Sequence, residues 1–261
     1  MEELTIEALQ DIIKGFADDG KVFSNESQFQ FELAWAIAKK SNCFKVNFEY
    51  LFELSESKKK AYIDLTIENE NKKVYAIELK YKTPDKECVY KCNNKKTHTF
   101  AQGAEDCGCY DYLKDVERLE ALVNKEKDVE KGFAIILTNS SKYYVHPKPN
   151  HTYYWENFFL KNEKTIERKL YWKDPRIEPE GENVICEEND GKVLWKYVKD
   201  KKPCDNNHPG FSCTKERYKE IELKNEYKIV WEKYALKTEK SPKSPEFKYL
   251  ILEINKSIKG K

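Results

Sequence analysis

Arginine and histidine, two side chains that carry much of protein chemistry, are both scarce in this chain of 261 residues. It contains four histidines and four arginines, which are Arg118, Arg168, Arg176 and Arg217. Since a bidentate contact to guanine favours arginine, this scarcity argues against a highly sequence-specific restriction enzyme. Four histidines also leave few bases for a Ser–His or Cys–His catalytic system, and none of them stands in a recognisable context.

Several familiar motifs are absent. The chain has no G-x4-G-K-[ST], G-x-G-x-x-G, H-E-x-x-H or G-x-S-x-G sequence, which excludes P-loop nucleotide hydrolases, dinucleotide enzymes and the commoner hydrolase classes. No apolar run approaches the ~18 residues of a membrane span, and the first residues, MEELTIEALQ, are acidic and amphipathic, unlike a signal peptide. We therefore expect a cytoplasmic protein with no membrane partner.

The net charge of the chain gives no indication of nucleic-acid binding. The formal net charge is +1, so any contact with DNA must depend on local lysines such as Lys58–Lys60, Lys72–Lys73 and Lys95–Lys96. With 39% hydrophobic residues and five tryptophans the chain can bury a substantial core. The length predicts one large domain, or a core with an elaborated second half.

The most informative stretch is 61–81, AYIDLTIENENKKVYAIELKY, which predicts two strands joined by a polar turn. Asp64 lies on the first strand. Glu78 and Lys80 lie two positions apart on the second, so their side chains leave the same face, whereas Ile77 and Leu79 point into a core. Carboxylate oxygens are preferred ligands of Mg²⁺, so these two residues could bind it. A lysine beside them can orient or deprotonate an attacking water, or neutralise charge on a phosphate.

This stretch resembles the active-site motif of the PD-(D/E)XK nuclease superfamily, which has the restriction-endonuclease-like fold. The resemblance places the acidic metal ligands on Asp64 and Glu78 and the catalytic lysine on Lys80, while Ile63 stands where the name of the motif has proline. It implies a phosphodiesterase that depends on Mg²⁺ or Mn²⁺. Because 36% of the residues are charged, the alternative is a solvated hairpin that carries an ordinary Glu/Lys pair.

A helix is predicted for residues 26–40, with a buried stripe formed by Phe29, Leu33, Ala36 and Ile37. Glu32 lies on this stripe. The superfamily resemblance implies a further metal or water ligand from this helix, which adds Glu32 to the catalytic and metal-binding residues. The alternative is a glutamate that reaches past the core to solvent, and Glu26, in the first turn, is the second candidate for the ligand.

The order of the predicted elements agrees with the motif. Strands over 44–54, 61–68 and 73–81 follow the helix, and then come a helix over 100–124 and a buried strand over 131–138, KGFAIILT. This αβββαβ order, an α/β fold with a mixed sheet, resembles the core of the same superfamily. Residues 83–97 are expected to form a polar loop.

The resemblance becomes narrower in the second half of this core. The sequence QGAEDCGCYDYLKDVERLE, followed by GFAIILTNSSKYY, resembles a group of uncharacterised bacterial members of the superfamily. It places Gln102 near the metal or the substrate phosphate at a helix start, and Cys109 stands where a basic residue is expected. The alternative for Gln102 is a solvent-exposed residue beside the helix cap.

Two regions are predicted along the chain. Residues 1–142 would form the nuclease-like core, and residues 143–261 a β-rich extension that is either separate or packed on the same core, with strands over 193–198, 227–234 and 249–254. The eight cysteines include Cys88, Cys92, Cys107 and Cys109, whose spacing permits a structural zinc site, although free thiols are the simpler interpretation.

These observations lead to one expected function and one rival. The expected function is a metal-dependent nuclease, an endonuclease rather than an exonuclease, that hydrolyses DNA, or alternatively RNA, in restriction, phage defence or repair. Enzymes of this kind that cut both strands are often dimers, so a homodimer is a further expectation. The rival is a non-catalytic module that binds nucleic acid or protein and keeps the nuclease fold.

Overall fold

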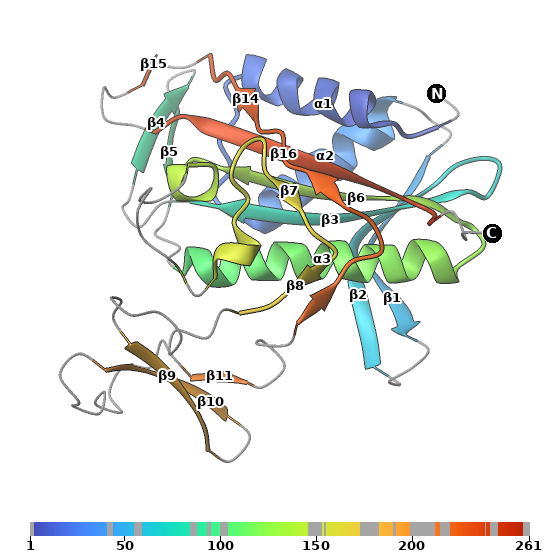
Figure 1. Ribbon diagram of the computed structural model, residues 1–261. Helices are drawn as coiled ribbons and strands as arrows, with labels where there is room; N and C mark the ends of the chain where they lie inside the picture. Colours follow the sequence, from blue (N-terminus) through green and yellow to red (C-terminus); the bar gives the residue numbers. More distant parts are fainter. Residues whose placement is uncertain are drawn as a thin grey trace.

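A mixed six-stranded sheet lies between two helices on one face and a long helix on the other (Figure 1). The computed structural model describes residues 3–40, 44–54, 59–83, 88–92, 95–99, 104–145, 153, 155–172, 183–189, 192–198, 212–214, 220–237, 239–240 and 245–257. The strand order in the sheet is β1-β2-β3-β6-β16-β14. The fold is therefore mixed α/β, as predicted.

In the described part of the chain, three α-helices form the outer layers: α1 (Ile6–Asp18), α2 (Glu26–Lys40) and α3 (Glu105–Lys125). Thr5 caps α1 by accepting the N–H of Ala8, and Asn25 accepts the N–H of Gln28 at the start of α2. The bounds predicted for the helix over 26–40 are confirmed. The predicted helix over 100–124 begins later, at Glu105.

The sheet combines a meander with a parallel crossover. Its strands are β1 (Lys45–Leu54), β2 (Lys59–Glu68), β3 (Val74–Lys82), β6 (Val129–Thr138), β16 (Phe247–Asn255) and β14 (Glu232–Tyr234). The first three pair antiparallel in chain order, whereas β3 and β6 run parallel with α3 between them in the chain. A parallel pair needs such a long connection, so α3 is placed against the sheet. The predicted order of helix, three strands, helix and strand is present.

The remaining elements form small sheets and two single helical turns. They are β4 (Cys88–Cys92), β5 (Lys95–Thr99), β15 (Glu239–Lys240), β7 (Thr165–Ile166), β8 (Lys169–Leu170), β12 (Ile221–Glu222), β13 (Tyr227–Lys228), β9 (Asn183–Asn189), β10 (Lys192–Val198), β11 (Ser212–Thr214), η1 (Ser141–Tyr143) and η2 (Glu156–Phe158).

Two of these observations correct the predictions. The stretch 83–97, predicted as a loop, contributes the β4–β5 hairpin, which β15 extends. The single strand predicted over 227–234 is two strands, because β13 pairs with β7 whereas β14 pairs with β16.

The two faces of the sheet cover two hydrophobic cores. On β3, Tyr75, Ile77, Leu79 and Tyr81 belong to the core under α1 and α2, whereas Ala76 belongs to the core under α3. The alternation of side chains along a strand therefore directs Glu78 and Lys80 towards α3.

The residues after 142 are joined to the same sheet and the same cores. β16 pairs with β6 over eight residue pairs, and its Tyr249 and Ile251 lie in the core that contains the N-terminal helices. A buried carboxylate, Glu120 on α3, accepts hydrogen bonds from the N–H groups of Lys224 and Asn225 and from the hydroxyl of Tyr227. Over their described parts, the regions 1–142 and 143–261 thus contribute to the same sheet and to both hydrophobic cores.

Within the described ranges, none of the helices combines the length and the apolar character that crossing a membrane requires.

Candidate active site

Asp64 lies at the point where β2 separates from β3. The ladder between these strands runs from Glu68–Val74 to Leu65–Ile77 and ends there. The next residues on the two strands are Asp64 and Glu78, so the two carboxylates stand on either side of the fork. The hairpin that was predicted from the sequence therefore brings Asp64 and the Glu-x-Lys segment together.

An irregularity in the β1–β2 ladder lies at this fork. The pairing passes from Phe48–Leu65 directly to Tyr50–Ile63, which leaves Glu49 and Asp64 unpaired in the ladder. Glu49 has a φ of 48°, which is uncommon for any residue other than glycine. The register is the same on both sides of this gap, and the gap lies where the ladder between β2 and β3 ends.

Gln30 on α2 joins the two irregular residues. Its side-chain amide donates to the backbone carbonyl of Asp64 at 2.7 Å and to Oε1 of Glu49 at 3.3 Å. The carbonyl would otherwise lack a ladder partner, and an unpaired backbone group is costly. Gln30 therefore helps to set the position of Asp64.

Two carboxylates cover the edge of β3 that β2 has left. Oδ2 of Asp64 accepts the N–H of Leu79 at 2.7 Å, and Oε2 of Glu26 accepts the N–H of Tyr81 at 2.7 Å. Because the N–H and C=O of one strand residue point to the same side, the carbonyl of Leu79 faces this edge as well. The ammonium of Lys80 donates to that carbonyl at 3.2 Å.

The opposite wall of the site is α3. Asp115 and Arg118 are three residues apart and so share one helix face. Oδ2 of Asp115 lies 2.7 Å from Nζ of Lys80, and its Oδ1 lies 2.6 Å from Nη2 of Arg118. The same Nη2 lies 2.7 Å from Oε1 of Glu78, which is 2% exposed. We call Glu26, Asp64, Glu78, Lys80, Asp115 and Arg118 the acid–base cluster.

Burial makes the negative charges of this cluster costly. It raises the pKa of Glu78 well above its usual range, and the neighbouring Asp115 raises it further, while Arg118 acts in the opposite sense. Burial likewise raises the pKa of Asp115 in spite of Lys80 and Arg118, and that of Glu26 in spite of Lys80. A further positive charge at the site would relieve this cost.

The two cations of the cluster stay protonated. Burial by itself would lower the pKa of Lys80, but the negative charges of Asp115, Glu26 and Asp64 raise it overall. The pKa of Arg118 is also raised, because Asp115 and Glu78 outweigh the effect of burial. Lys80 is therefore an ammonium near neutral pH, suited to holding or stabilising an oxygen rather than to removing a proton.

Two predicted site residues are not brought into this cluster by the described contacts. Glu32 forms an ion pair with Lys21 at 2.7 Å. It is rotated by about 200° around α2 from Gln30, which contacts Asp64. Glu26, the second candidate, is one turn from Gln30 and occupies the site instead. Gln102 lies outside the described residues.

Three residues of the site were not predicted from the sequence: Gln30, Asp115 and Arg118. Asp115 and Arg118 lie three residues apart on the helix predicted over 100–124, so an acid and a base about one turn apart were the available signal. Their partners are up to 40 residues away in the chain, and only the tertiary fold pairs them. For Gln30 the sequence offers no comparable signal.

The donors at the fork fit a small divalent cation. One oxygen each of Asp64 and Glu78 has no hydrogen-bond partner among the described residues. When all six groups of the cluster are ionised, four carboxylates face two cations. Mg²⁺ is commonly bound by only one or two carboxylates together with water. Across the described ranges, no three His, Cys, Asp or Glu side chains converge closely enough to hold a metal ion by themselves.

The cysteines proposed for zinc lie in two different elements. Cys88 and Cys92 are on β4, and their side chains lie outside the described residues. Cys107 and Cys109 lie in the first turns of α3 and form no disulfide with each other or with another described residue. Complete burial raises the pKa of Cys109, which favours the thiol over the thiolate that zinc binds.

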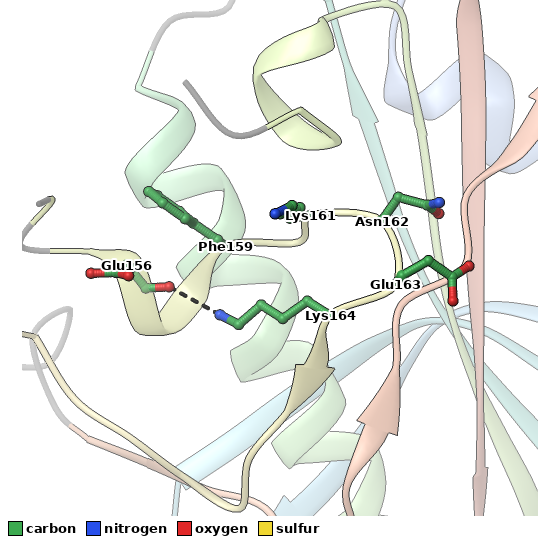
Figure 2. A pocket seen from close by; sticks show the side chains of 6 residues that line it. All are labelled: Glu156, Phe159, Lys161, Asn162, Glu163 and Lys164. Atoms are coloured by element: carbon green, nitrogen blue, oxygen red, sulfur yellow. Dashed lines mark hydrogen bonds between the residues drawn. The ribbon is translucent and has the colours of Figure 1, made fainter. Parts of the chain in front are cut away.

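A pocket of about 450 Å³ lies elsewhere, in the segment that follows η1 (Figure 2). It is lined by Glu156, Phe159, Lys161, Asn162, Glu163 and Lys164. The ammonium of Lys164 is held by the backbone carbonyls of Glu156 and Asn157 at 3.0 and 2.9 Å. No member of the acid–base cluster lines this pocket, so we place the candidate chemistry at the fork.

Comparisons with known proteins assign no family. No protein-family model, no curated protein and no solved structure matches the chain.

Proposed function

We propose that this protein is a metal-dependent nuclease that hydrolyses phosphodiester bonds of DNA. One observation carries the proposal: Asp64 is held at 2.7 Å against the backbone N–H of Leu79, the residue between Glu78 and Lys80. The two carboxylates and the lysine thus meet where β2 leaves β3. The segment from α2 to β6 would be a restriction-endonuclease-like αβββαβ core, with β4 and β5 inserted before α3.

Asp64 and Glu78 would hold Mg²⁺ or Mn²⁺ through their unpartnered oxygens. Glu26 and the carbonyl of Leu79 face the same edge of β3 and could supply additional oxygen donors. When bound, the cation would polarise the phosphate and lower the pKa of a water molecule. It would also offset the excess negative charge of the cluster.

Lys80 would act as a fixed cation. Its ion pair with Asp115 at 2.7 Å anchors the ammonium, which is only 17% exposed. An ammonium in this position can orient the attacking water and stabilise the negative charge that develops on the phosphate oxygens. Arg118, already paired with both Glu78 and Asp115, would keep the acidic groups in place.

Several aspects of the proposal extend the sequence resemblance. The cleavage would be endonucleolytic, with RNA as an alternative substrate to DNA, and it would occur in the cytoplasm during restriction, phage defence or repair. A homodimer would allow both strands of a duplex to be cut.

The test uses Lys80→Ala with Lys72→Ala as a matched control. Lys72 lies on the turn of the same hairpin and pairs with Glu68 at the surface. Plasmid, linear duplex and single-stranded DNA are incubated with each protein in Mn²⁺. We expect Lys80→Ala to lose about 10²-fold or more in cleavage rate while its affinity for Mn²⁺ is retained. Normal cleavage by Lys80→Ala would refute the assignment.

The pairing within the cluster also favours a second candidate, a binding module that keeps this fold. Arg118 already pairs with Glu78, and Lys80 already pairs with Asp115, so these side chains have partners without a bound metal ion. This candidate predicts nucleic-acid or protein binding with no cleavage in Mg²⁺ or Mn²⁺ by the wild-type protein.

A further inference from the structure

Exposed apolar side chains are concentrated in one part of the chain, on α2, β1 and β2. Nine large hydrophobic side chains are exposed in the described part of the chain, and six of them fall between residues 31 and 62. Phe31 and Trp35 on α2 are 57% and 53% exposed, and Tyr62 on β2 is 56% exposed. Scattered exposed apolar residues need no explanation, but a cluster of aromatic rings usually marks a binding surface.

Strand pairing shows which of these rings share a face. Residues directly opposite each other on neighbouring strands lie on the same face of a sheet. Phe48 pairs with Leu65, which lies in the core under α1 and α2. Tyr62 neighbours Ile63, which lies in the opposite core, so Tyr62 also faces the α2 side. Phe31, Trp35, Phe48 and Tyr62 form what we call the aromatic patch.

The rings on α2 are arranged to present flat surfaces. Phe31 and Trp35 are one helical turn apart, with ring centroids separated by 6.5 Å and planes inclined by only 8°. The ammonium of Lys39 lies 5.1 Å from the centroid of the Trp35 ring. Lys39, Lys40 and Lys45 are all exposed, so positive charge borders the aromatic patch.

The aromatic patch is continuous with the candidate active site. Gln30, which precedes Phe31, donates its side-chain amide to the carbonyl of Asp64, two residues from Tyr62. A polymer that reaches the fork at Asp64 can therefore also touch these rings. Its chemistry must combine flat apolar surfaces with negative charges, and a nucleic-acid strand with unpaired bases has both.

We propose that the aromatic patch stacks on unpaired bases of the substrate, so that the preferred substrate is single-stranded or locally unpaired nucleic acid. This inference rests on the proposed nuclease function. Bases in an intact duplex are already stacked on one another, so only unpaired bases offer a face to the rings. The lysines at the border of the patch contact the phosphates between those bases.

The test measures binding in EDTA, where no cleavage occurs, by fluorescence anisotropy. The probes are a labelled single strand of about 16 nucleotides, an abasic strand of equal length and the corresponding duplex. The variant Phe31→Leu/Trp35→Leu keeps apolar side chains but removes both rings. Tyr171→Leu, which removes an exposed ring outside the patch, is the matched control, and thermal unfolding checks that all proteins are folded.

We expect the wild type and Tyr171→Leu to bind the base-bearing strand at least about 10-fold more tightly than the abasic strand. The double variant should lose this preference while binding the abasic strand as the wild type does. Equal preference in the double variant, or no preference in the wild type, overturns the proposal. It is also overturned if the double substitution dissociates a dimer, measured by sedimentation, without changing the affinity for the single strand.

Cleavage of DNA in Mn²⁺ by the same preparations separates this inference from the nuclease proposal. Cleavage without a preference for the base-bearing strand would show that the aromatic patch does not bind the substrate, while the nuclease proposal would stand. Base preference that depends on Phe31 and Trp35, without cleavage, supports the patch and favours the binding module instead.

Discussion

Arg118 on α3 closes over Glu78 on β3, with 2.7 Å between the guanidinium Nη2 and the carboxylate Oε1. A second bond from Nε of Arg118 reaches the same oxygen at 2.8 Å. The pair ties the covering helix to the strand that carries both Glu78 and Lys80. It also compensates a carboxylate that is almost completely removed from water.

Removing this guanidinium should destabilise the protein. Arg118→Met leaves Glu78 and Asp115 without their shared cation, and breaking a buried ion pair on one side costs about 3 kcal/mol. Arg168→Met is the control, because Arg168 is well exposed and its ion pair with Glu226 is long, at 4.0 Å. This substitution should change the free energy of unfolding by no more than about 0.5 kcal/mol. Urea denaturation near neutral pH measures both. Equal stabilities of the two variants would contradict the role of Arg118.

The cost of Arg118→Met should also depend on pH. Burial raises the pKa of Glu78 in the folded state above its ordinary value of 4.5. At a pH between 4.5 and this raised pKa, the folded state therefore binds more protons than the unfolded state. Stability then falls as pH rises through this window. Without Arg118 the pKa of Glu78 in the folded state rises further, so the stability deficit of the variant should grow as pH rises from the folded-state pKa of the wild type to that of the variant, and should shrink as pH falls back through this range. A deficit that does not change with pH would contradict this explanation.

Two glutamates on one helix provide a second prediction. Glu26→Gln keeps an acceptor for the N–H of Tyr81 but removes a negative charge from the edge of β3, so it should weaken Mn²⁺ binding by about 10-fold. Glu32→Gln removes only a partly exposed ion pair with Lys21 and should leave Mn²⁺ binding unchanged. Calorimetric titration compares the two. A larger loss of Mn²⁺ affinity in Glu32→Gln than in Glu26→Gln would mean that Glu32, and not Glu26, contributes to the metal site.

A third prediction concerns the attachment of residues 220–227 to α3. Glu120→Ala removes the shared acceptor of Lys224, Asn225 and Tyr227. Because these donors lose a buried partner, the free energy of unfolding should fall by about 3 kcal/mol or more. Glu117→Ala, one turn earlier, removes an acceptor for the N–H of Glu222 at the surface and should cost less than about 1 kcal/mol. Urea denaturation of both variants tests the difference, and comparable losses would contradict it.

Local patterns predicted most of the sheet. The alternation along residues 61–81 placed Asp64, Glu78 and Lys80 on a hairpin, and the apolar spacing gave the bounds of α2. The β4–β5 hairpin was missed, although Asn93-Asn94 between two stretches with strand-forming residues was a turn signal. The strand predicted over 227–234 was wrong because its two parts pair with different strands, which only the tertiary fold decides.

The candidate site was harder to predict from local patterns. Glu32 was chosen over Glu26 because it lies closer to the apolar stripe of α2. In the structure, Gln30 and Glu26 lie on the side of α2 that faces the fork, and the partners of Gln30, Asp64 and Glu49, are an irregular pair in a strand ladder. Asp115 and Arg118 are paired with strand residues through the crossover of α3, and no local pattern specifies such a pairing.

The central claim is that Asp64 helps to bind a divalent cation at the fork between β2 and β3. Asp64→Asn tests it most directly, because the amide oxygen can still accept the N–H of Leu79 while the negative charge is lost. Calorimetric titration with Mn²⁺ should detect one site in the wild type and at least about 10-fold weaker binding in Asp64→Asn. Equal binding by the two proteins would mean that Asp64 only caps the edge of β3, and the binding module would replace the nuclease.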